Sequence, residues 1–252
     1  MSSRDPADVA RTAVERWFPG ARAAWLGGSA ARGGWTATSD LDITVLLAGP
    51  PAPYRESTRL GGWPVELFVH TAASLAHYQA QDVARRQPTM LRLVGESVVL
   101  VDLDGVGTAL RGDCRRQVAL GPTPLTAAEL ASMRYRVTDL IDDLTGVTDA
   151  LERTAIATAL WDTVLRLHLG AAGCWLGTGK GLVREVAGLD AVSGTDDART
   201  FDRALRASLD GDVAPLVGAA DRVLAPLGGR LFEGYRMGGE LGADPGGPRA
   251  SG

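Results

Sequence analysis

The sequence is poor in cysteine, and it has neither a long hydrophobic run nor an excess of positive charge. Only two cysteines, Cys114 and Cys174, occur in 252 residues, and they lie far apart. A disulfide framework or a cysteine-ligated metal therefore has no support. The formal net charge is −4 and the pI is near 5.4. This balance lacks the basic excess that neutralises nucleic-acid phosphates, so we expect no nucleic-acid substrate.

Membrane and export signals are also missing. No run of about 18 apolar residues is present that could span a bilayer, and the segment after Met1 is amphipathic without the apolar core of a signal peptide. We therefore expect a cytoplasmic protein in a reducing compartment, without membrane contact.

The apolar pattern divides the chain into a strand-bearing part and a helical part. Strands are expected at 23–26, 41–47, 65–69 and 98–103, with helices near 6–17 and 72–86. Later segments are helical in period and contain no further strand: 126–144, 151–169, 200–209 and 213–224. The predicted fold class is α+β, with a short mixed sheet flanked by helices in residues 1–120 and a helical bundle in 121–241. Residues 242–252, rich in glycine and proline, are expected to form a disordered tail.

Two aspartates stand at the start of the second expected strand. Side chains two apart on a strand point to the same face, so Asp40 and Asp42 should converge while Leu41 and Ile43 turn into the core. Two carboxylates directed at one point repel each other unless cations lie between them. Magnesium, a hard ion that prefers oxygen ligands, meets that need.

A third carboxylate and a glycine-rich turn complete the pattern. Glu66 alternates with the apolar residues of the next strand and so falls on its opposite face. Three carboxylates could hold two metal ions, of which one activates an attacking hydroxyl and the other steadies a leaving pyrophosphate. Gly27, Gly28 and Ser29 lie where a strand turns into a helix, which allows backbone N–H groups to approach a polyphosphate.

The segments Leu26-Gly-Gly-Ser29 and Ser39-Asp-Leu-Asp42, followed by Glu66, resemble the DNA polymerase β-like nucleotidyltransferase superfamily. Its motif is Gly-Ser, then Asp-x-Asp, then a carboxylate on a later strand. The likeness covers roughly residues 20–105. The short chain and its helical second half are similar to the small-molecule branch, which includes aminoglycoside nucleotidyltransferases. That half matches only loosely, so no substrate residues can be carried over.

Together, the residues and the resemblance imply magnesium-dependent transfer of a nucleoside monophosphate, AMP from ATP, to a hydroxyl of a small molecule. The acceptor could be aminoglycoside-like, and pyrophosphate would be released. Two magnesium ions would be held by Asp40, Asp42 and Glu66, and the nucleotide would contact Gly28 and Ser29. The expected partners are the nucleotide and a small-molecule acceptor. A homodimer is one oligomeric state that the sequence allows.

Lys180 is the only lysine among 26 basic residues. The surrounding segment 173–184 has the glycine-rich character of a P-loop, but Cys174 and Gly181 stand where that motif requires glycine and Ser or Thr. A compact lysine charge in such a loop can still bind a phosphate. We therefore expect Lys180 to contact the nucleotide.

The general base is less well defined. Asp139 and Asp142 share a face of the helix expected at 126–144 with Tyr135, and Asp139 is our candidate. A solvated acidic face explains the same pattern equally well. A base is not required if a metal lowers the pKa of the hydroxyl, or if Glu66 accepts the proton.

Two other functions remain open at this stage. The segment Val98–Val106 is similar to the first motif of haloacid dehalogenase-type phosphatases, with Asp102 as nucleophile and Asp104 as acid/base. That fold needs several parallel strands after the motif, whereas helices are expected here. The chain could also be a nucleotidyltransferase-fold module that binds or modifies a protein partner, in the manner of an antitoxin. The complete carboxylate set favours catalysis over this second alternative.

Overall fold

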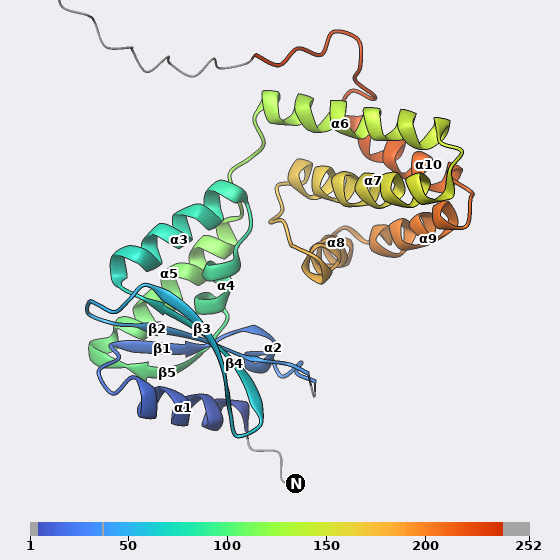
Figure 1. Ribbon diagram of the computed structural model, residues 1–252. Helices are drawn as coiled ribbons and strands as arrows, with labels where there is room; N and C mark the ends of the chain where they lie inside the picture. Colours follow the sequence, from blue (N-terminus) through green and yellow to red (C-terminus); the bar gives the residue numbers. More distant parts are fainter. Residues whose placement is uncertain (1–4, 37, 239–252) are drawn as a thin grey trace, which may run out of the picture. The chain divides into compact units, whose positions relative to one another are not determined.

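The computed structural model describes residues 5–36 and 38–238, which form two compact units (Figure 1). The first unit comprises the residues up to Pro124 together with Ala172–Ser193, and the second comprises Leu125–Ala171 and the residues from Gly194 onward. The expected tail 242–252 lies outside the described residues. None of the helices described is both long and apolar enough to cross a membrane.

A five-stranded mixed sheet forms the centre of the first unit, in the order β3-β4-β2-β1-β5. Strands β2 and β4 are parallel, and every other neighbouring pair is antiparallel. The bounds are β1 Ala23–Leu26, β2 Leu41–Leu46, β3 Tyr54–Leu60, β4 Trp63–His70 and β5 Val98–Asp102. The α+β fold class and the four expected strands are confirmed, and β3 is an additional strand at the edge of the sheet.

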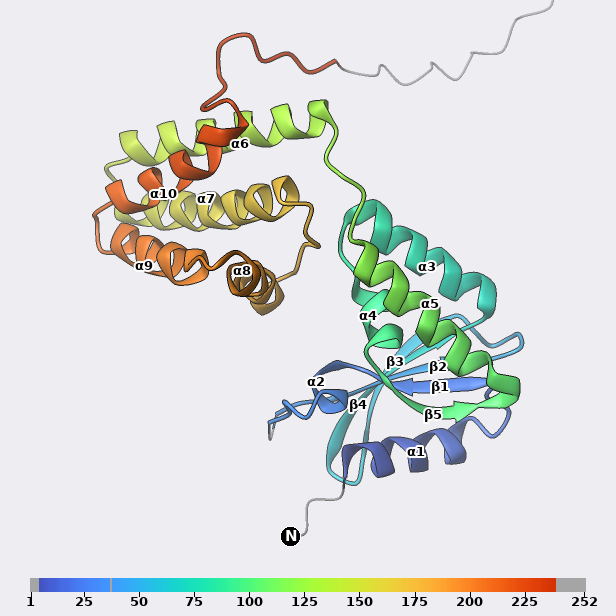
Figure 2. The same ribbon diagram turned by 180° about the vertical axis from the view of Figure 1, so that it is seen from behind.

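Helices cover both faces of this sheet (Figures 1 and 2). Helix α1 packs on one face, and α3, α4 and α5 pack on the other. The remaining helical elements of the unit are the single turns α2 and η1 and the separate helix α8. The bounds are α1 Pro6–Trp17, α2 Gly28–Ala31, α3 Ala72–Arg85, α4 Thr89–Gly95, η1 Leu103–Gly105, α5 Val106–Leu120 and α8 Lys180–Ser193.

The alternation along β2 decides which side chains enter which layer of the core. Leu41, Ile43 and Val45 are fully buried against α1, whereas Leu46 joins Trp25 in the layer beneath α3, α4 and α5. Burying an aliphatic side chain of this size contributes about 1.5–3 kcal/mol. This alternation of apolar side chains fixes which way each residue of β2 points. It leaves Asp42 on the face of the sheet that α3, α4 and α5 cover.

The helix starts follow from capping chemistry in the sequence. Asp5 precedes Pro6 at the first position of α1, and its carboxylate accepts a hydrogen bond of 2.8 Å from the N–H of Ala7. Thr71 and Ser74 form a reciprocal capping box at the start of α3. These caps explain why the helices begin where the sequence predicts.

The segment 172–193 is tied to the first unit by specific contacts. The N–H of Leu176 donates to the carbonyl of Arg86 at 2.7 Å, and the indole N–H of Trp175 donates to the carbonyl of Val118 at 2.8 Å. Sequence reasoning had assigned this segment to the helical part. The boundary at residue 120 stays a prediction, but the structure groups α8 with the sheet.

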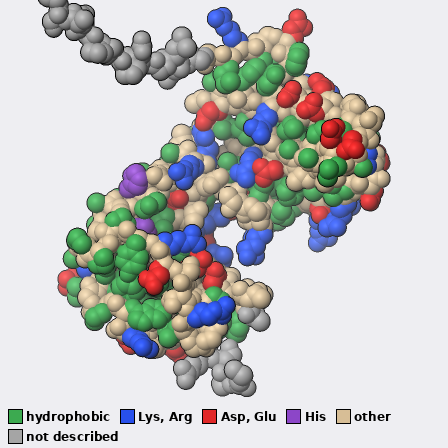
Figure 3. Space-filling model, in the orientation of Figure 1, with side chains coloured by type: hydrophobic (Ala, Val, Ile, Leu, Met, Phe, Trp, Pro, Cys, Tyr) green, Lys and Arg blue, Asp and Glu red, His purple; other side chains and the backbone are tan. Residues whose placement is uncertain are grey.

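The second unit is helical, as expected, and no strand occurs in its described residues. It contains α6 Ala127–Gly146, α7 Ala150–Ala171, α9 Asp197–Leu209, α10 Ala214–Leu224 and the short η2 Ala225–Leu227. Thr126 and Glu129 form a capping box at the start of α6. On the face that Figure 3 displays, acidic and basic side chains are interspersed over the first unit rather than gathered by sign.

Candidate active site

Three carboxylates meet at the end of the parallel strand pair. Asp42 on β2 lies beside Glu66 on β4 in the strand register, and Asp40 precedes β2 by one residue. The three side chains each offer an oxygen, and these oxygens lie within 4.8 Å of one another. All three residues are half-buried. This arrangement suits a hard divalent cation with oxygen ligands, magnesium above all.

The glycine turn packs directly against one of these carboxylates. A Cβ on Gly28 would lie 2.0 Å from Oδ2 of Asp42, and the φ of Gly28 is +65°. A Cβ on Gly27 would lie 2.7 Å from the carbonyl oxygen of Leu93. The N–H of Gly27 also donates to the carbonyl of Asp42 at 2.8 Å. Gly28 is therefore required for the turn to approach Asp42 this closely, and Gly27 is required for the turn to pack against Leu93.

The cluster is electrostatically strained without a cation. Burial, followed by the neighbouring charges of Asp40 and Glu66, raises the pKa of Asp42 from 3.8 to about 6. An ordinary surface ion-pair network would lower this pKa instead. The raised value fits a carboxylate that ionises fully when a metal binds, because a bound cation compensates both the burial and the repulsion.

Arg55 on β3 adds a positive charge to the cluster. Its Nη2 donates to Oε2 of Glu66 at 2.6 Å, and its guanidinium lies 4.9 Å from the centre of the Phe68 ring. This ion pair orients Oε2 of Glu66. The other carboxylate oxygen, Oε1, does not take part in it. Sequence reasoning missed Arg55, because β3 has too few apolar residues to be recognised as a strand.

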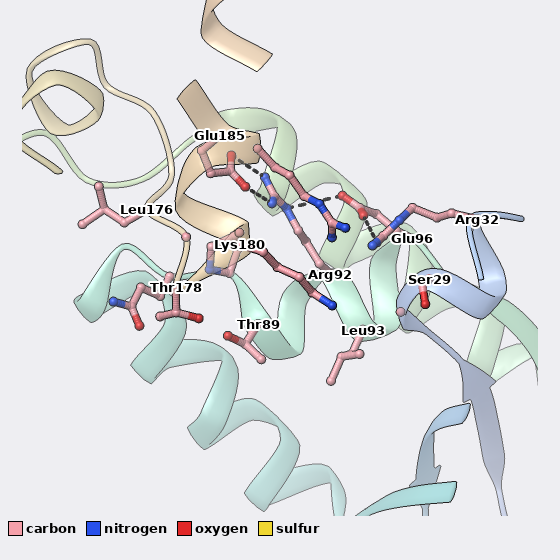
Figure 4. Close-up of a pocket in the computed structure, with 17 residues that line it drawn as sticks. Ser29, Arg32, Thr89, Arg92, Leu93, Glu96, Leu176, Thr178, Lys180 and Glu185 are labelled. Carbon is pink, nitrogen blue, oxygen red and sulfur yellow. Dashed lines mark hydrogen bonds and ion pairs between the residues drawn. The ribbon is translucent and has the colours of Figure 1, made fainter. Parts of the chain in front are cut away.

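A cavity of about 700 Å³ begins at the glycine turn. Gly28, Ser29 and Arg32 line one end, and Leu176, Thr178 and Lys180 line the other (Figure 4). All of its lining residues belong to the first unit. The structure therefore brings together three residues that sequence reasoning placed at the nucleotide, namely Gly28, Ser29 and Lys180.

Basic side chains outnumber acidic ones in this cavity. Arg32, Arg92, Lys180 and Arg184 line it, against Glu96 and Glu185. Arg92 is held by both glutamates, through a two-fold contact with Glu185 and a 3.4 Å contact with Glu96, and Arg32 reaches Glu96 at 3.0 Å. Among the described residues, Lys180 and Arg184 have no ion-pair partner. The excess of positive charge favours an anionic ligand with several charges.

No sequence motif marks Arg92, Arg184 or Glu185. Arg92 lies on α4, which is only seven residues long and so has little helical periodicity, and Arg184 and Glu185 lie on α8. The buried Trp175, in contrast, is a core residue whose N–H is used by the backbone of α5.

Asp139 lies on the exposed face of α6 in the second unit. Its neighbour Tyr135 stacks on Tyr235, with ring centroids 4.2 Å apart, and Asp142 pairs with Arg230 at 3.4 Å. The role of Asp139 as a base stays a prediction.

The phosphatase alternative conflicts with the fold. Asp102 ends the edge strand β5, and its carboxylate accepts from the N–H of Gly107 at 2.7 Å and from the hydroxyl of Thr108 at 2.6 Å. These hydrogen bonds, led by that of Thr108, lower the pKa of Asp102. It caps the start of α5, and no parallel strand follows it in the described part of the chain.

One family model matches the part of the chain that carries the carboxylate cluster. Residues 8–74 match the family model described as a nucleotidyltransferase domain, a range that contains the glycine turn and all three carboxylates. A solved structure of a nucleotidyltransferase-like protein from Exiguobacterium sibiricum is 14% identical, with a TM-score of 0.41. The similarity covers 87% of this chain and 74% of that one. No curated protein matches the chain.

The family match and the site geometry agree on the same residues. The turn at Gly28 and Ser29, the Asp-x-Asp pair and the strand carboxylate Glu66 all fall within the matched range, and the structure assembles them at one point. The resemblance to the DNA polymerase β-like superfamily, stated from the motif, agrees with this match of residues 8–74 to a nucleotidyltransferase domain.

Proposed function

We propose that the protein transfers AMP from ATP to a hydroxyl group of a small molecule and that this reaction depends on magnesium. The observation that carries the proposal is the convergence of Asp40, Asp42 and Glu66 beside the Gly27-Gly28-Ser29 turn. Carboxylates so placed serve metal-assisted phosphoryl chemistry better than any structural role, because they repel one another in the absence of a cation.

The proposed reaction forms one bond and breaks one. The acceptor hydroxyl oxygen bonds to the α-phosphorus, the bond from this phosphorus to the bridging oxygen breaks, and pyrophosphate leaves with that oxygen. The hydroxyl proton passes to a base, for which Glu66 and Asp139 are the candidates. Magnesium bound at the three carboxylates would supply Lewis acidity and offset the charge of the triphosphate.

The basic cavity next to the turn is the proposed nucleotide site. Its volume of about 700 Å³ lies within the range of roughly 300–1,000 Å³ that small-molecule sites occupy. Backbone N–H groups near Gly28 and the hydroxyl of Ser29 would bind phosphate oxygens at one end. Lys180 and Arg184 would contribute positive charge farther along the cavity. A nucleoside triphosphate matches both the size and the charge.

Nucleotide binding should depend on the metal. We expect ATP to bind at least about tenfold more weakly in EDTA than in magnesium, since the uncompensated carboxylates repel the triphosphate by more than about 1.4 kcal/mol. Isothermal titration calorimetry with and without the metal measures this difference. Equal affinity under the two conditions would remove the support for a magnesium-dependent site.

Lys180 should strengthen nucleotide binding. Lys180→Ala is expected to weaken MgATP binding about tenfold, because an exposed charge-assisted contact contributes near the lower end of about 1.5–3 kcal/mol. Lys180→Arg should rescue only part of this loss, since a planar guanidinium replaces a compact ammonium. Arg16→Ala, which removes an exposed charge from α1 on the other face of the sheet, is the control. Wild-type affinity in Lys180→Ala would return this lysine to a surface role.

A further inference from the structure

A second cavity, of about 410 Å³, lies in the first unit beside the carboxylate cluster. It is formed by β3, β4, α3 and the start of α4, and its walls include the rings of Tyr54, Phe68, His70 and Tyr78. The nucleotide cavity and this one share two lining residues, Gln87 and Thr89. They are therefore adjoining spaces with different linings.

The strand register connects the second cavity to the active site. Glu66, Phe68 and His70 alternate along β4, so all three point to the same face, about 7 Å apart for each step of two residues. Arg55 pairs with Phe68 in the register of β3 and β4, and its guanidinium reaches both the Phe68 ring and the Glu66 carboxylate. The cavity thus begins at the Glu66 side of the cluster.

The nucleotide cavity, in contrast, approaches the carboxylate cluster at Asp42. Gly28 lines that cavity and packs on Asp42, which is the register partner of Glu66. The two cavities therefore approach the metal-binding carboxylates from two directions. Such a placement is required when a group passes from a donor in one pocket to an acceptor in the other.

His70 presents an unsatisfied polar atom in the second cavity. The residue is only 5% exposed, and its Nε2 has no hydrogen-bond partner among the described residues. Its Nδ1 lies 3.3 Å from the hydroxyl of Ser74, which itself donates to the carbonyl of Thr71 at 3.2 Å. The same hydroxyl also accepts from the N–H of Thr71 at 2.9 Å, so the contact with Nδ1 fits either tautomer of the ring. Burial lowers the pKa of His70, consistent with a neutral ring.

An unpartnered buried polar atom costs stability unless something binds to it. A ligand hydroxyl, which can both donate and accept, would satisfy Nε2 in either tautomer. The aromatic walls add a preference for rings, since Tyr78 is 42% exposed and meets the His70 ring edge-on at 5.3 Å. Recognition of a planar or cyclic molecule with a hydroxyl group follows from these two features.

The lining of this cavity carries more basic than acidic side chains. The acid that lines the cavity, Asp82, is committed to the start of α4, where its Oδ2 accepts from the N–H of Leu91 at 2.8 Å. Arg55 and Arg85 place two positive charges on the same lining. Because Arg55 is paired with Glu66, the remaining positive charge on the lining is that of Arg85, which favours a neutral or anionic ligand over one with several amines.

We propose that this second cavity is the acceptor pocket, and that the acceptor is a ring-bearing hydroxylated molecule of neutral or negative charge, held at its far end by His70. The proposal rests on the nucleotidyl transfer proposed above and names its substrate class. It differs from the aminoglycoside-like acceptor that the sequence resemblance suggested, because the charge of Arg85 suits a neutral or anionic molecule better than a polycation.

Ligand-observed NMR tests this assignment with 4-hydroxybenzoate and related hydroxylated aromatics as probes. We expect them to bind at millimolar concentration to the wild type, and five- to tenfold more weakly to His70→Phe and Tyr78→Ala, about the change that one hydrogen bond gives. His77→Phe is the matched control, because His77 lies on α3 beside Tyr78 but does not line the cavity. Melting temperatures check that each variant folds, and exposed Tyr78 can be removed without a core cavity.

Each contrary result has a distinct meaning. Failure of every aromatic probe to bind, or equal binding to His70→Phe and the wild type, overturns the acceptor pocket. Tighter binding of kanamycin than of the aromatic anions overturns the charge argument. Competition by adenosine, or loss of MgATP binding in His70→Phe, would assign the cavity to the nucleobase and also overturn the proposal.

Calorimetry with MgATP on the same wild-type preparation separates the two levels of inference. Tight MgATP binding combined with probe binding that depends on His70 supports both the transfer and the acceptor pocket. If the probes bind in the same way but MgATP does not bind, both nucleotidyl transfer and the acceptor role are overturned. The cavity would then be only a ligand-binding pocket.

Discussion

Asp42→Asn is expected to lower the rate of nucleotidyl transfer on the order of a thousandfold while the fold is retained. A catalytic metal supplies several kcal/mol of stabilisation to the transition state, and about 1.4 kcal/mol corresponds to a factor of ten. Asparagine keeps the shape of the side chain but removes the charge that would bind magnesium. The substituted residue faces the carboxylate cluster rather than the apolar core, so no packing is lost.

Pyrophosphate release from MgATP measures this effect, with water as the acceptor until a better one is known. Asp102→Asn is the matched control, since it makes the same chemical change at an aspartate that caps α5. The control should keep nearly full activity. Retained activity in Asp42→Asn would contradict the metal site, and loss of phosphatase activity in Asp102→Asn would support the rejected phosphatase function.

The carboxylate cluster could be predicted because its signal is local and periodic. Alternation within β2 places Asp42 on the opposite face of the strand from Leu41 and Ile43. The same rule places Glu66 on the opposite face of β4 from Val65. The structure confirms these two faces directly. That β2 and β4 would lie side by side and in parallel was not derivable from either strand alone, because pairing depends on the whole sheet.

Strand β3 was missed for a physical reason. Its sequence, Tyr-Arg-Glu-Ser-Thr-Arg-Leu, is mostly polar, and the strand lies at the edge of the sheet where little of it needs to be buried. Hydrophobic periodicity carries no information in such a segment. Arg55, which links Glu66 to the second cavity, was missed together with the strand.

Helices α4, α5 and α8 were missed on different grounds. Helix α4 is short, and α5 contains Gly107 and Gly112, which weaken a helical pattern. Helix α8 begins at Lys180 within a segment that resembles a P-loop, so its periodic Leu182 and Val186 were overlooked. Long-range contacts such as that of Arg92 with Glu185 brought this segment to the sheet, and no local pattern encodes them.

The stability of the metal-free protein should fall as the pH rises through about 6. Burial and the charges of Asp40 and Glu66 raise the pKa of Asp42 from 3.8 to about 6, so the folded state holds a proton there more tightly than the unfolded chain does. The resulting stabilisation is fully present below about pH 4 and is lost as the pH rises through the folded value. A difference of two pKa units corresponds to about 3 kcal/mol.

Magnesium should reverse this dependence, because it binds the ionised form of Asp42. The increase in melting temperature caused by magnesium should therefore be small near pH 5 and large near pH 7.5. In Asp42→Asn, the metal-free protein should lose the pH-dependent component and gain little from magnesium at either pH. Hydrogen bonds lower the pKa values of Asp102 and Asp221, whereas burial raises the pKa of Asp82, so the comparison with Asp42→Asn isolates the contribution of Asp42. A magnesium shift of the same size at both pH values, or one that persists in Asp42→Asn, would show that the ion binds somewhere other than the carboxylate cluster.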